Sequence, residues 1–121
     1  MAKIVVVDDA PEVVALISST LAAAGHAVMH WDADSGFERR LTADRPDLIL
    51  LDIVMPTRDG YDLLRSIKRN PDTQSIPVVL VSKKGAVSDR EWGRMQGADD
   101  YLVKPFTNEQ LSTVVAKFVR W

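Results

Sequence analysis

Short apolar runs alternate along the chain with longer segments in which apolar residues recur at helical spacing. Three runs, Ile4–Val7, Leu48–Leu51 and Val78–Val81, have the composition of strands buried on both faces. Two shorter or more polar runs, Ala27–Trp31 and Tyr101–Val103, predict two further strands on the flanks of the same sheet. The pattern therefore predicts five strands.

Segments of helical spacing lie between these runs. The first helix is predicted to open with Pro11 in its first turn and to stop at Gly25, with Val14, Ile17 and Leu21 on one side. The last segment places four apolar residues at i, i+3, i+4 and i+7: Leu111, Val114, Val115 and Phe118. Strands and helices alternate throughout, which predicts a parallel sheet with right-handed crossovers and helices on both faces, an α/β three-layer sandwich.

Three tetrads predict helix starts by pairing a hydroxyl with a carboxylate or amide three residues later. They are Ser35-x-x-Glu38, Ser88-x-x-Glu91 and Thr107-x-x-Gln110. Each lies where the hydrophobic period changes, so we expect a helix to begin after each hydroxyl residue.

Length and charge narrow the class of protein. The 121 residues, 46% hydrophobic and 26% charged, fit one globular domain over residues 1–121. Lys and Arg number 15 against 17 Asp and Glu, so the chain lacks a basic field and we expect no direct nucleic-acid binding. The absence of cysteine excludes disulfides and thiol chemistry. Acidic residues follow the first four apolar ones, too soon for a membrane span, so we expect a cytoplasmic protein without membrane contact.

Residues that can carry chemistry follow four of the predicted strands. Asp8 and Asp9 follow the first strand, Asp52 the third, Ser82 the fourth and Lys104 the fifth. The carboxyl ends of parallel strands share one rim, where such sheets bind ligands. Three carboxylates at one rim repel each other unless a cation lies among them, and Mg²⁺ suits oxygen ligands of this kind. With the metal and the lysine drawing off charge, a carboxylate can attack phosphorus and form an acyl phosphate.

Each of these residues also has an ordinary structural explanation. Asp8 and Asp9 could cap the next helix, and Asp52 could end its strand in a turn. Ser82 could lie in a loop or cap a helix, and Lys104 could be a solvated charge. Only their joint placement at one rim favours the chemical interpretation.

Five motifs together resemble the receiver-domain family of two-component signalling, over essentially the whole chain. They are Asp8-Asp9, Asp52-Ile53-Val54-Met55-Pro56, Asp59-Gly60, Ser82, and Tyr101-Leu102-Val103-Lys104-Pro105. The resemblance implies a flavodoxin-like (βα)5 sandwich whose five-stranded sheet has the order 2-1-3-4-5. It also implies a response regulator that is activated by phosphorylation in a phosphorelay.

The resemblance further implies a role for each acidic residue of the rim. Asp52 would accept a phosphoryl group from a sensor histidine kinase. Asp9, aided by Asp8 through water, would hold Mg²⁺ together with Asp52. The backbone carbonyl of Val54 would complete the protein ligands, and Lys104 would contact the phosphoryl group.

Three further roles come from the same resemblance. The peptide bond between Lys104 and Pro105 would be cis. Ser82 and Tyr101 would form a switch, in which the hydroxyl moves to the phosphate and the aromatic ring turns inward. The loop that begins at Met55-Pro56 and ends at Asp59-Gly60 would lead into the third helix.

We expect the output to be protein binding, since no effector segment follows the last helix. The resemblance places the target surface on the fourth helix, fifth strand and fifth helix, with Trp92, Tyr101 and the outer side of residues 107–120. The protein would then be a monomer or a phosphorylation-dependent dimer. It would assist its own phosphotransfer and dephosphorylation without being a metabolic enzyme.

A narrower resemblance lies in residues 91–101, EWGRMQGADDY, which are similar to the single-domain regulators of type IV pilus twitching motility. Trp92-Gly93 and Gln96 carry most of this signal, because Gly97-Ala98 before an acidic pair is widespread among receivers. Trp92 could equally be a partly buried core residue.

The chain departs from the family pattern beside the expected acceptor. Lys83 stands after Ser82, where the family usually has a small residue, and could steer phosphodonors or simply project into solvent. Val54 and Lys84 would flank the path of hydrolytic water. Because Val54 cannot orient water by hydrogen bonding, we predict slow self-dephosphorylation.

Two other functions compete with this interpretation. Haloacid-dehalogenase-type phosphohydrolases also use an aspartyl nucleophile with Mg²⁺, but they place a second Asp two residues later, where this chain has Val54. A receiver that binds its partners constitutively and is never phosphorylated is the other alternative. It is disfavoured because all the expected acceptor-site residues are present.

Overall fold

A computed structural model describes residues 1–119, and its strands form one parallel sheet. The strands are β1 (Lys3–Val7), β2 (Ala27–His30), β3 (Leu48–Asp52), β4 (Val78–Ser82) and β5 (Asp100–Val103). Their order is β2-β1-β3-β4-β5, with every neighbouring pair parallel. The predicted strands and their order are therefore confirmed, with ends that shift by one residue.

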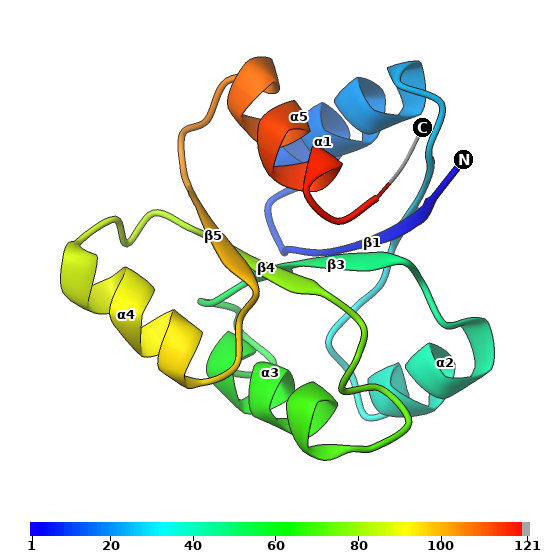
Figure 1. The fold of residues 1–121 in the computed structure, drawn as a ribbon, viewed down its shortest axis with the longest axis vertical. Coiled ribbons are helices and arrows are strands. Elements are labelled where there is room, and N and C mark those ends of the chain that lie inside the picture. The colour runs from blue at the N-terminus through cyan, green and yellow to red at the C-terminus, as the bar shows by residue number, and fades with distance from the viewer. Residues whose placement is uncertain (120–121) are drawn as a thin grey trace.

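The helices cover both faces of the sheet, so the predicted three-layer sandwich is confirmed. They are α1 (Pro11–Ala23), α2 (Phe37–Asp44), α3 (Gly60–Arg69), α4 (Val87–Met95) and α5 (Asn108–Ala116). Helices α1 and α5 lie against one face, and α2, α3 and α4 lie against the other (Figure 1).

Two apolar cores separate the three layers because side chains alternate along each strand. Val5 and Leu51 point into the core beneath α2 and α3, which also contains Phe37. Val6 and Leu50 point into the opposite core, beneath α1 and α5. Strands β3 and β4 are buried along their whole lengths, as expected for the central positions that their apolar runs predicted.

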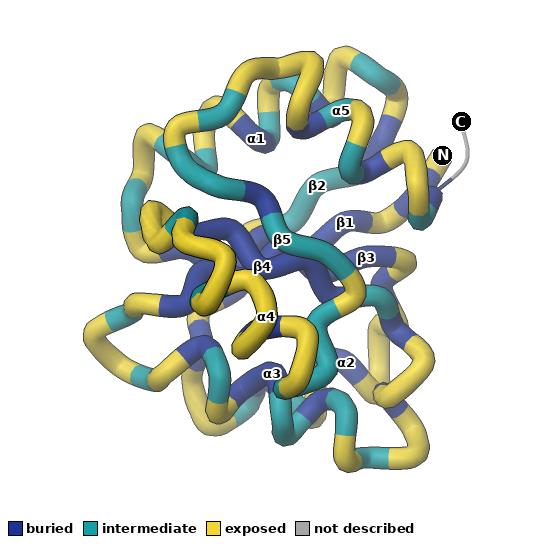
Figure 2. The backbone as a smooth tube through the Cα atoms, turned by 60° about the vertical axis from the view of Figure 1, so that its left-hand side comes forward, coloured by how far each residue is buried: buried dark blue, intermediate teal, exposed yellow. Residues whose placement is uncertain are grey.

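Helix α4 is the most exposed element of the sandwich. Gly93 is its one buried residue, and Figure 2 shows the rest of the helix mostly exposed. A Cβ at Gly93 would lie 2.8 Å from Cδ1 of Leu80 and 3.4 Å from Cδ2 of Tyr101. The glycine therefore allows α4 to approach the sheet closely.

The helix ends test the three predicted capping boxes, of which one is correct. Thr107 Oγ1 accepts from the Gln110 amide at 3.0 Å, and Gln110 Oε1 accepts from the Thr107 amide at 2.9 Å. The Ser35 box is wrong because α2 begins at Phe37, with Gly36 at the N-cap and Glu38 turned to other partners.

The Ser88 box is wrong as well. Helix α4 begins at Val87, one residue before the expected hydroxyl, and Ala86 is at its N-cap. The Ala86 amide donates to Oδ2 of Asp89 at 3.2 Å, while Glu91 pairs with Arg94. An acidic residue two positions before the expected one therefore caps this helix.

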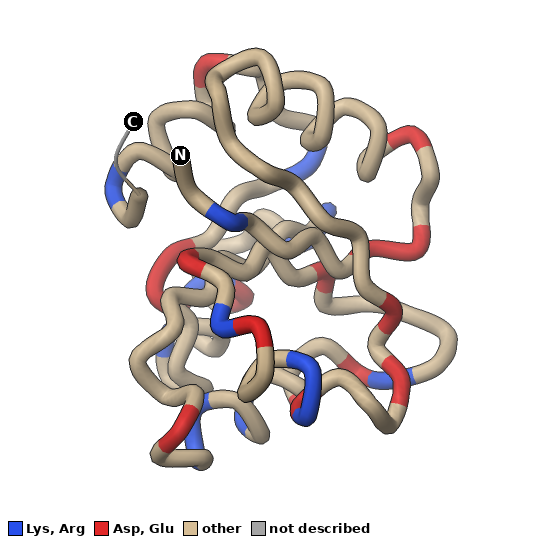
Figure 3. The backbone as a smooth tube through the Cα atoms, turned by 90° about the vertical axis from the view of Figure 1, so that its right-hand side faces the viewer, with Lys and Arg blue, Asp and Glu red and all other residues tan. Residues whose placement is uncertain are grey.

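Charge and hydropathy add two observations. In the view of Figure 3, basic and acidic positions are interspersed along the backbone, most densely in the lower half of the picture. Within residues 1–119, none of the helices has the length and apolar character that crossing a lipid bilayer requires.

Candidate functional site

The carboxyl ends of β1, β3 and β5 bring the predicted rim residues together. Carboxylate oxygens of Asp8, Asp9 and Asp52 all lie within 4.8 Å of one another. Lys104 Nζ lies 2.7 Å from Oδ2 of Asp8 and 3.6 Å from Oδ1 of Asp52. The parallel register explains the convergence, because it places Val7 beside Leu51, the residue before Asp52.

The three carboxylates have different surroundings. Asp8 is buried, and both of its oxygens are engaged, one by the Ala10 amide at 2.9 Å and the other by Lys104. Asp9 is exposed, and among residues 1–119 its side chain has no hydrogen-bond or ion-pair partner. Asp8 thus forms a turn ahead of α1 but does not cap the helix, whose N-cap is Ala10 without a side-chain cap, and Asp9 is left with a free carboxylate.

Asp52 is held in an unfavourable environment for its charge. Burial raises the pKa of its carboxyl to about 6, with a further rise from the neighbouring Asp8 charge. The Lys104 ammonium and a hydrogen bond from the Val54 amide act in the opposite direction. A cation placed among the three carboxylates would relieve this repulsion, and an all-oxygen set of this kind can hold a hard divalent metal.

Asp52 is reachable although it is only 6% exposed. It lies in a cavity of about 320 Å³. The lining residues are Asp9, Ala10, Asp52, Val54, Ser82, Lys83, Lys84 and Lys104. The exposed Lys83 and Lys84 line this cavity, and Val54, whose residue is 62% exposed, forms a wall of it.

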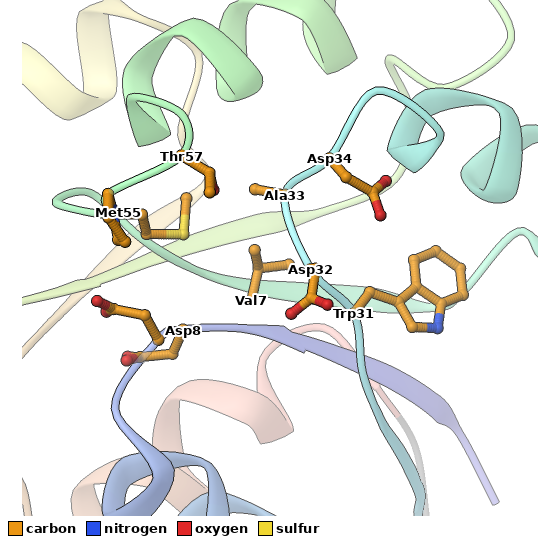
Figure 4. A pocket seen from close by; sticks show the side chains of 10 residues that line it. Val7, Asp8, Trp31, Asp32, Ala33, Asp34, Met55 and Thr57 are labelled. Carbon is orange, nitrogen blue, oxygen red and sulfur yellow. The ribbon is translucent and has the colours of Figure 1, made fainter.

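A second cavity, of about 410 Å³, adjoins the acidic residues on the β2 side. Figure 4 shows Asp8 at its floor, Met55 and Thr57 on one wall, and Asp32 and Ala33 on the other. The walls come from the loop after β3 and the segment that follows β2.

The expected switch residues lie on neighbouring strands, with Ser82 at the carboxyl end of β4 and Tyr101 beside Leu80, two positions earlier in the register. Ser82 is buried, and its Oγ accepts a hydrogen bond from the Lys84 amide at 3.2 Å. The Tyr101 hydroxyl donates to the carbonyl of Lys84. Burial raises the pKa of Tyr101, and hydrogen bonding with the Ser82 hydroxyl partly opposes that rise. The peptide bond between Lys104 and Pro105 is cis, the isomer that the resemblance implies.

Trp92 lies on α4 and is 49% exposed. Its ring contacts Tyr61 of α3 edge to face, with centroids 6.4 Å apart. It therefore lies on the α3 side of α4, while Tyr101 lies on β5. The expected surface over residues 107–120 ends at Arg120, which is outside the described residues.

Several residues at the site were not predicted from the sequence. A Cβ at Gly60 would lie 2.3 Å from the carbonyl oxygen of Asp52, so only glycine fits where α3 passes the end of β3. His30 Nε2 donates to the carbonyl of Asp8 at 3.0 Å. Arg58 and Glu38 form a bidentate ion pair behind the loop after β3. The Asp59-Gly60 motif was a signal for the first of these, whereas the other two depend on long-range contacts.

Comparisons with known proteins agree with this geometry. Residues 4–116 match the family model of the response regulator receiver domain. Protein PilH of Pseudomonas aeruginosa is 36% identical over 111 residues, which cover 92% of both chains. A crystal structure of the chemotaxis protein CheY4 of Vibrio cholerae superposes with a TM-score of 0.84 at 27% identity, over 98% of this chain and 99% of that one.

Longer regulators match over only part of their length. The phosphate regulon transcriptional regulatory protein PhoB of Rhizobium meliloti is 35% identical over 98% of this chain, which corresponds to 52% of that protein. The chain thus spans about half the length of such relatives and nearly all of PilH. The family model covers almost the entire sequence, and the acidic rim lies within it, so the chain belongs to the response regulator receiver domain family.

Proposed function

We propose that Asp52 is the phosphoacceptor of a two-component phosphorelay and receives its phosphoryl group from a sensor histidine kinase. The observation that carries the proposal is the position of Asp52, inside an open cavity, with two other carboxylates and the Lys104 ammonium within reach. No other group of His, Asp or Glu residues among residues 1–119 forms a comparable cluster.

We assign Mg²⁺ to the acidic rim on the basis of its oxygen ligands. Asp9 and Asp52 would hold the ion directly, and the backbone carbonyl of Val54 would complete the protein ligands. Asp8 would act through water, because both of its oxygens already accept hydrogen bonds. When bound, the ion supplies charge neutralisation for the transferring phosphoryl group.

The chemical step is a displacement at phosphorus. A carboxylate oxygen of Asp52 bonds to phosphorus as the bond from phosphorus to the donor histidine nitrogen breaks. The phosphohistidine is protonated on its other ring nitrogen, so the histidine leaves as the neutral imidazole. Lys104 would turn toward the new phosphoryl oxygens, which compete with Asp8 for its ammonium. The Ser82 hydroxyl, on the strand next to Asp52, would donate to another oxygen.

Phosphorylation would then switch a protein-binding surface. Ser82 and Tyr101 are already connected through Lys84, which donates its amide to one and accepts from the other at its carbonyl. Movement of the Ser82 hydroxyl toward phosphate would therefore alter the environment of Tyr101. We place the target surface on α4, β5 and α5, with Trp92 contributing from the α3 side.

The acceptor is tested by incubating the protein with Mg²⁺ and acetyl phosphate and measuring the intact mass. We expect a gain of one phosphoryl group in the wild type and none in Asp52→Asn. Asp59→Asn is a matched control, since Asp59 caps α3 outside the acidic rim. Labelling that persists in Asp52→Asn would contradict the assignment, and steady turnover of a phosphoester would favour a phosphohydrolase.

Target binding is tested by pulling down partners with beryllofluoride-treated and untreated protein. A receiver that binds its partners constitutively would recover the same partners from the beryllofluoride-treated and the untreated sample. We expect Trp92→Ala to lose partners seen only in the treated sample and still to incorporate phosphate. Normal partner recovery with Trp92→Ala would remove this residue from the surface.

The remaining expectations stay predictions. They are a monomer or phosphorylation-dependent dimer, a cytoplasmic location and a role in twitching motility.

A further inference from the structure

Three side chains from separate elements meet behind the loop that follows Asp52. Arg58 Nη1 donates to Oε1 of Glu38 at 2.9 Å, and Nη2 donates to Oε2 at 2.7 Å. Ser66 Oγ donates to Oε2 of Glu38 at 2.8 Å. We call Glu38, Arg58 and Ser66 the loop clamp. It joins the loop to α2 and α3.

The two charged side chains are only partly exposed, 26% for Arg58 and 32% for Glu38. Two parallel hydrogen bonds fix the orientation of the guanidinium as well as its distance, which a single contact would not do. The hydrogen bonds from Arg58 and then Ser66 lower the pKa of Glu38 to about 2 against the opposing effect of burial. The clamp therefore stays intact at any pH suitable for phosphotransfer.

The loop that the clamp holds reaches directly into the acceptor site. Its first part is fixed by the Gly60 amide, which donates to the carbonyl of Ile53 at 2.8 Å. The Val54 amide donates to the Asp52 carboxylate. Farther out, the ion pair between Arg58 and Glu38 attaches the loop to α2. A displacement of Arg58 would therefore also displace Val54 in the same loop.

The clamp also joins the two walls of the cavity in Figure 4. Met55, Pro56 and Thr57 form one wall and immediately precede Arg58. The opposite wall, residues 31–34, leads into α2, where Glu38 lies. Contact between Arg58 and Glu38 therefore sets how far the loop stands from Asp8 and Asp9.

We propose that Glu38 and Arg58 are positioning residues, which hold the 53–59 loop where Val54 can complete a divalent-cation site with Asp9 and Asp52. This inference rests on the proposed function, because it takes the acidic rim to be the Mg²⁺ site. It adds a requirement outside the rim: the loop clamp raises the affinity for the cation without touching it.

The experiment is a titration of Mg²⁺ into the unphosphorylated protein by isothermal titration calorimetry. Glu38→Gln and Arg58→Met are each expected to weaken Mg²⁺ binding about tenfold, the lower end of the effect of partners outside the ligand shell. The double variant is expected to be no weaker than either single variant, because both changes remove one contact. Ser66→Ala, which keeps the ion pair, is expected to weaken binding less.

Two controls separate this inference from the proposed function. Asp9→Asn should abolish binding, and Glu91→Gln should leave it unchanged, since Glu91 forms an exposed pair with Arg94 on α4. A wild type that binds no Mg²⁺ would count against the metal site itself. Binding that Asp9→Asn abolishes but the clamp variants leave unchanged would overturn the positioning role alone.

Stability is measured in parallel by urea unfolding. A purely structural clamp would lower the unfolding midpoint in the variants while their Mg²⁺ affinity stayed at the wild-type value, and that result would overturn the inference. If Arg58→Met did not fold, Glu38→Gln and Ser66→Ala would decide the question, since both keep the charge on Arg58.

Discussion

Lys104 forms a close ion pair with Asp8 rather than with Asp52: its Nζ lies 2.7 Å from Asp8 and 3.6 Å from Asp52. The ammonium thus compensates the carboxylate that is most deeply buried. Asp52 keeps a raised pKa even with the lysine nearby. In the unphosphorylated protein the carboxylates of the rim therefore repel one another. A bound cation, or movement of Lys104 toward Asp52, can relieve this repulsion.

Removal of this lysine charge should be costly in metal-free protein. The side chains of Lys104 and Asp8 are 10% and 2% exposed, so Lys104→Met would leave a buried charge without its partner. We expect a loss of about 3 kcal/mol of unfolding free energy at pH 7.5 in a chelator, measured by urea denaturation. Added Mg²⁺ should restore part of the loss.

The matched control for this prediction is Lys117→Met. Lys117 pairs with Asp100 at 2.8 Å, but its side chain is 56% exposed, and we expect a loss below about 1 kcal/mol. Equal losses in the two variants would show that burial of the Lys104 pair has no energetic consequence.

Asp52→Asn should stabilise the metal-free protein, in a pH-dependent way. Folding raises the pKa of Asp52 from its ordinary 3.8 to about 6, so the folded protein binds an extra proton between these values. The stabilisation that the protonated Asp52 carboxyl gives to the folded wild type is therefore present below pH 4. It is lost as pH rises toward 6. At pH 7.5 the variant should be more stable by up to about 3 kcal/mol.

The test is urea unfolding of both proteins in a chelator at pH 4 and pH 7.5. The variant's advantage should fall to well below about 1 kcal/mol at pH 4, because Asp52 is then protonated in the folded protein and already partly protonated in the unfolded one. Mg²⁺ at pH 7.5 should also reduce the advantage, because it binds the wild-type carboxylate. An advantage independent of pH would assign the effect to the amide itself.

Much of this site could be anticipated from local sequence. The strands ended within one residue of the apolar runs, and parallel geometry then placed Asp8, Asp52 and Lys104 on one rim. The capping box at Thr107 was also correct, because both of its partners lie in the same turn.

The sequence-based predictions that failed share one physical cause, which is competition from partners far away in the sequence. Glu38 had the spacing of a capping residue, yet Arg58, 20 positions away, and Ser66, 28 positions away, took its carboxylate. The spacing of residues within one segment carries no information about contacts with residues far away in the sequence.

The residue two positions after Asp52 should control how long the phosphoryl group persists. Val54 lines the cavity of Asp52 and offers no side-chain hydrogen bond to an attacking water. We expect loss of phosphate from the isolated wild type over minutes or longer, followed by intact mass. Val54→Asn should accelerate the loss about tenfold by orienting water toward phosphorus.

Val87→Asn is the control for this prediction, because Val87 is 74% exposed on α4 and does not line the acceptor cavity. It should leave the lifetime unchanged. Loss within seconds from the wild type would contradict the expected slow hydrolysis, and an unaltered lifetime in Val54→Asn would remove Val54 from the path of water.

Gly60 should tolerate no side chain, because its neighbours are backbone atoms. A Cβ would lie 2.3 Å from the Asp52 carbonyl oxygen and 2.6 Å from Cα of Ile53. Relief requires α3 to move away from β3, which would also displace the 53–59 loop. We expect Gly60→Ala to lose more than about 2 kcal/mol of unfolding free energy and to incorporate less phosphate.

Two other glycines separate this steric effect from ordinary backbone preferences. Gly36 has a negative φ and one contact at 3.4 Å, so Gly36→Ala should change stability little. Gly25 has a φ of +92° and open space around it, so Gly25→Ala should cost about 1 kcal/mol through backbone strain alone. If Gly60→Ala were no less stable than Gly25→Ala, the close approach of α3 to Asp52 would not be a constraint on the site, since the backbone would have moved aside at little energetic cost.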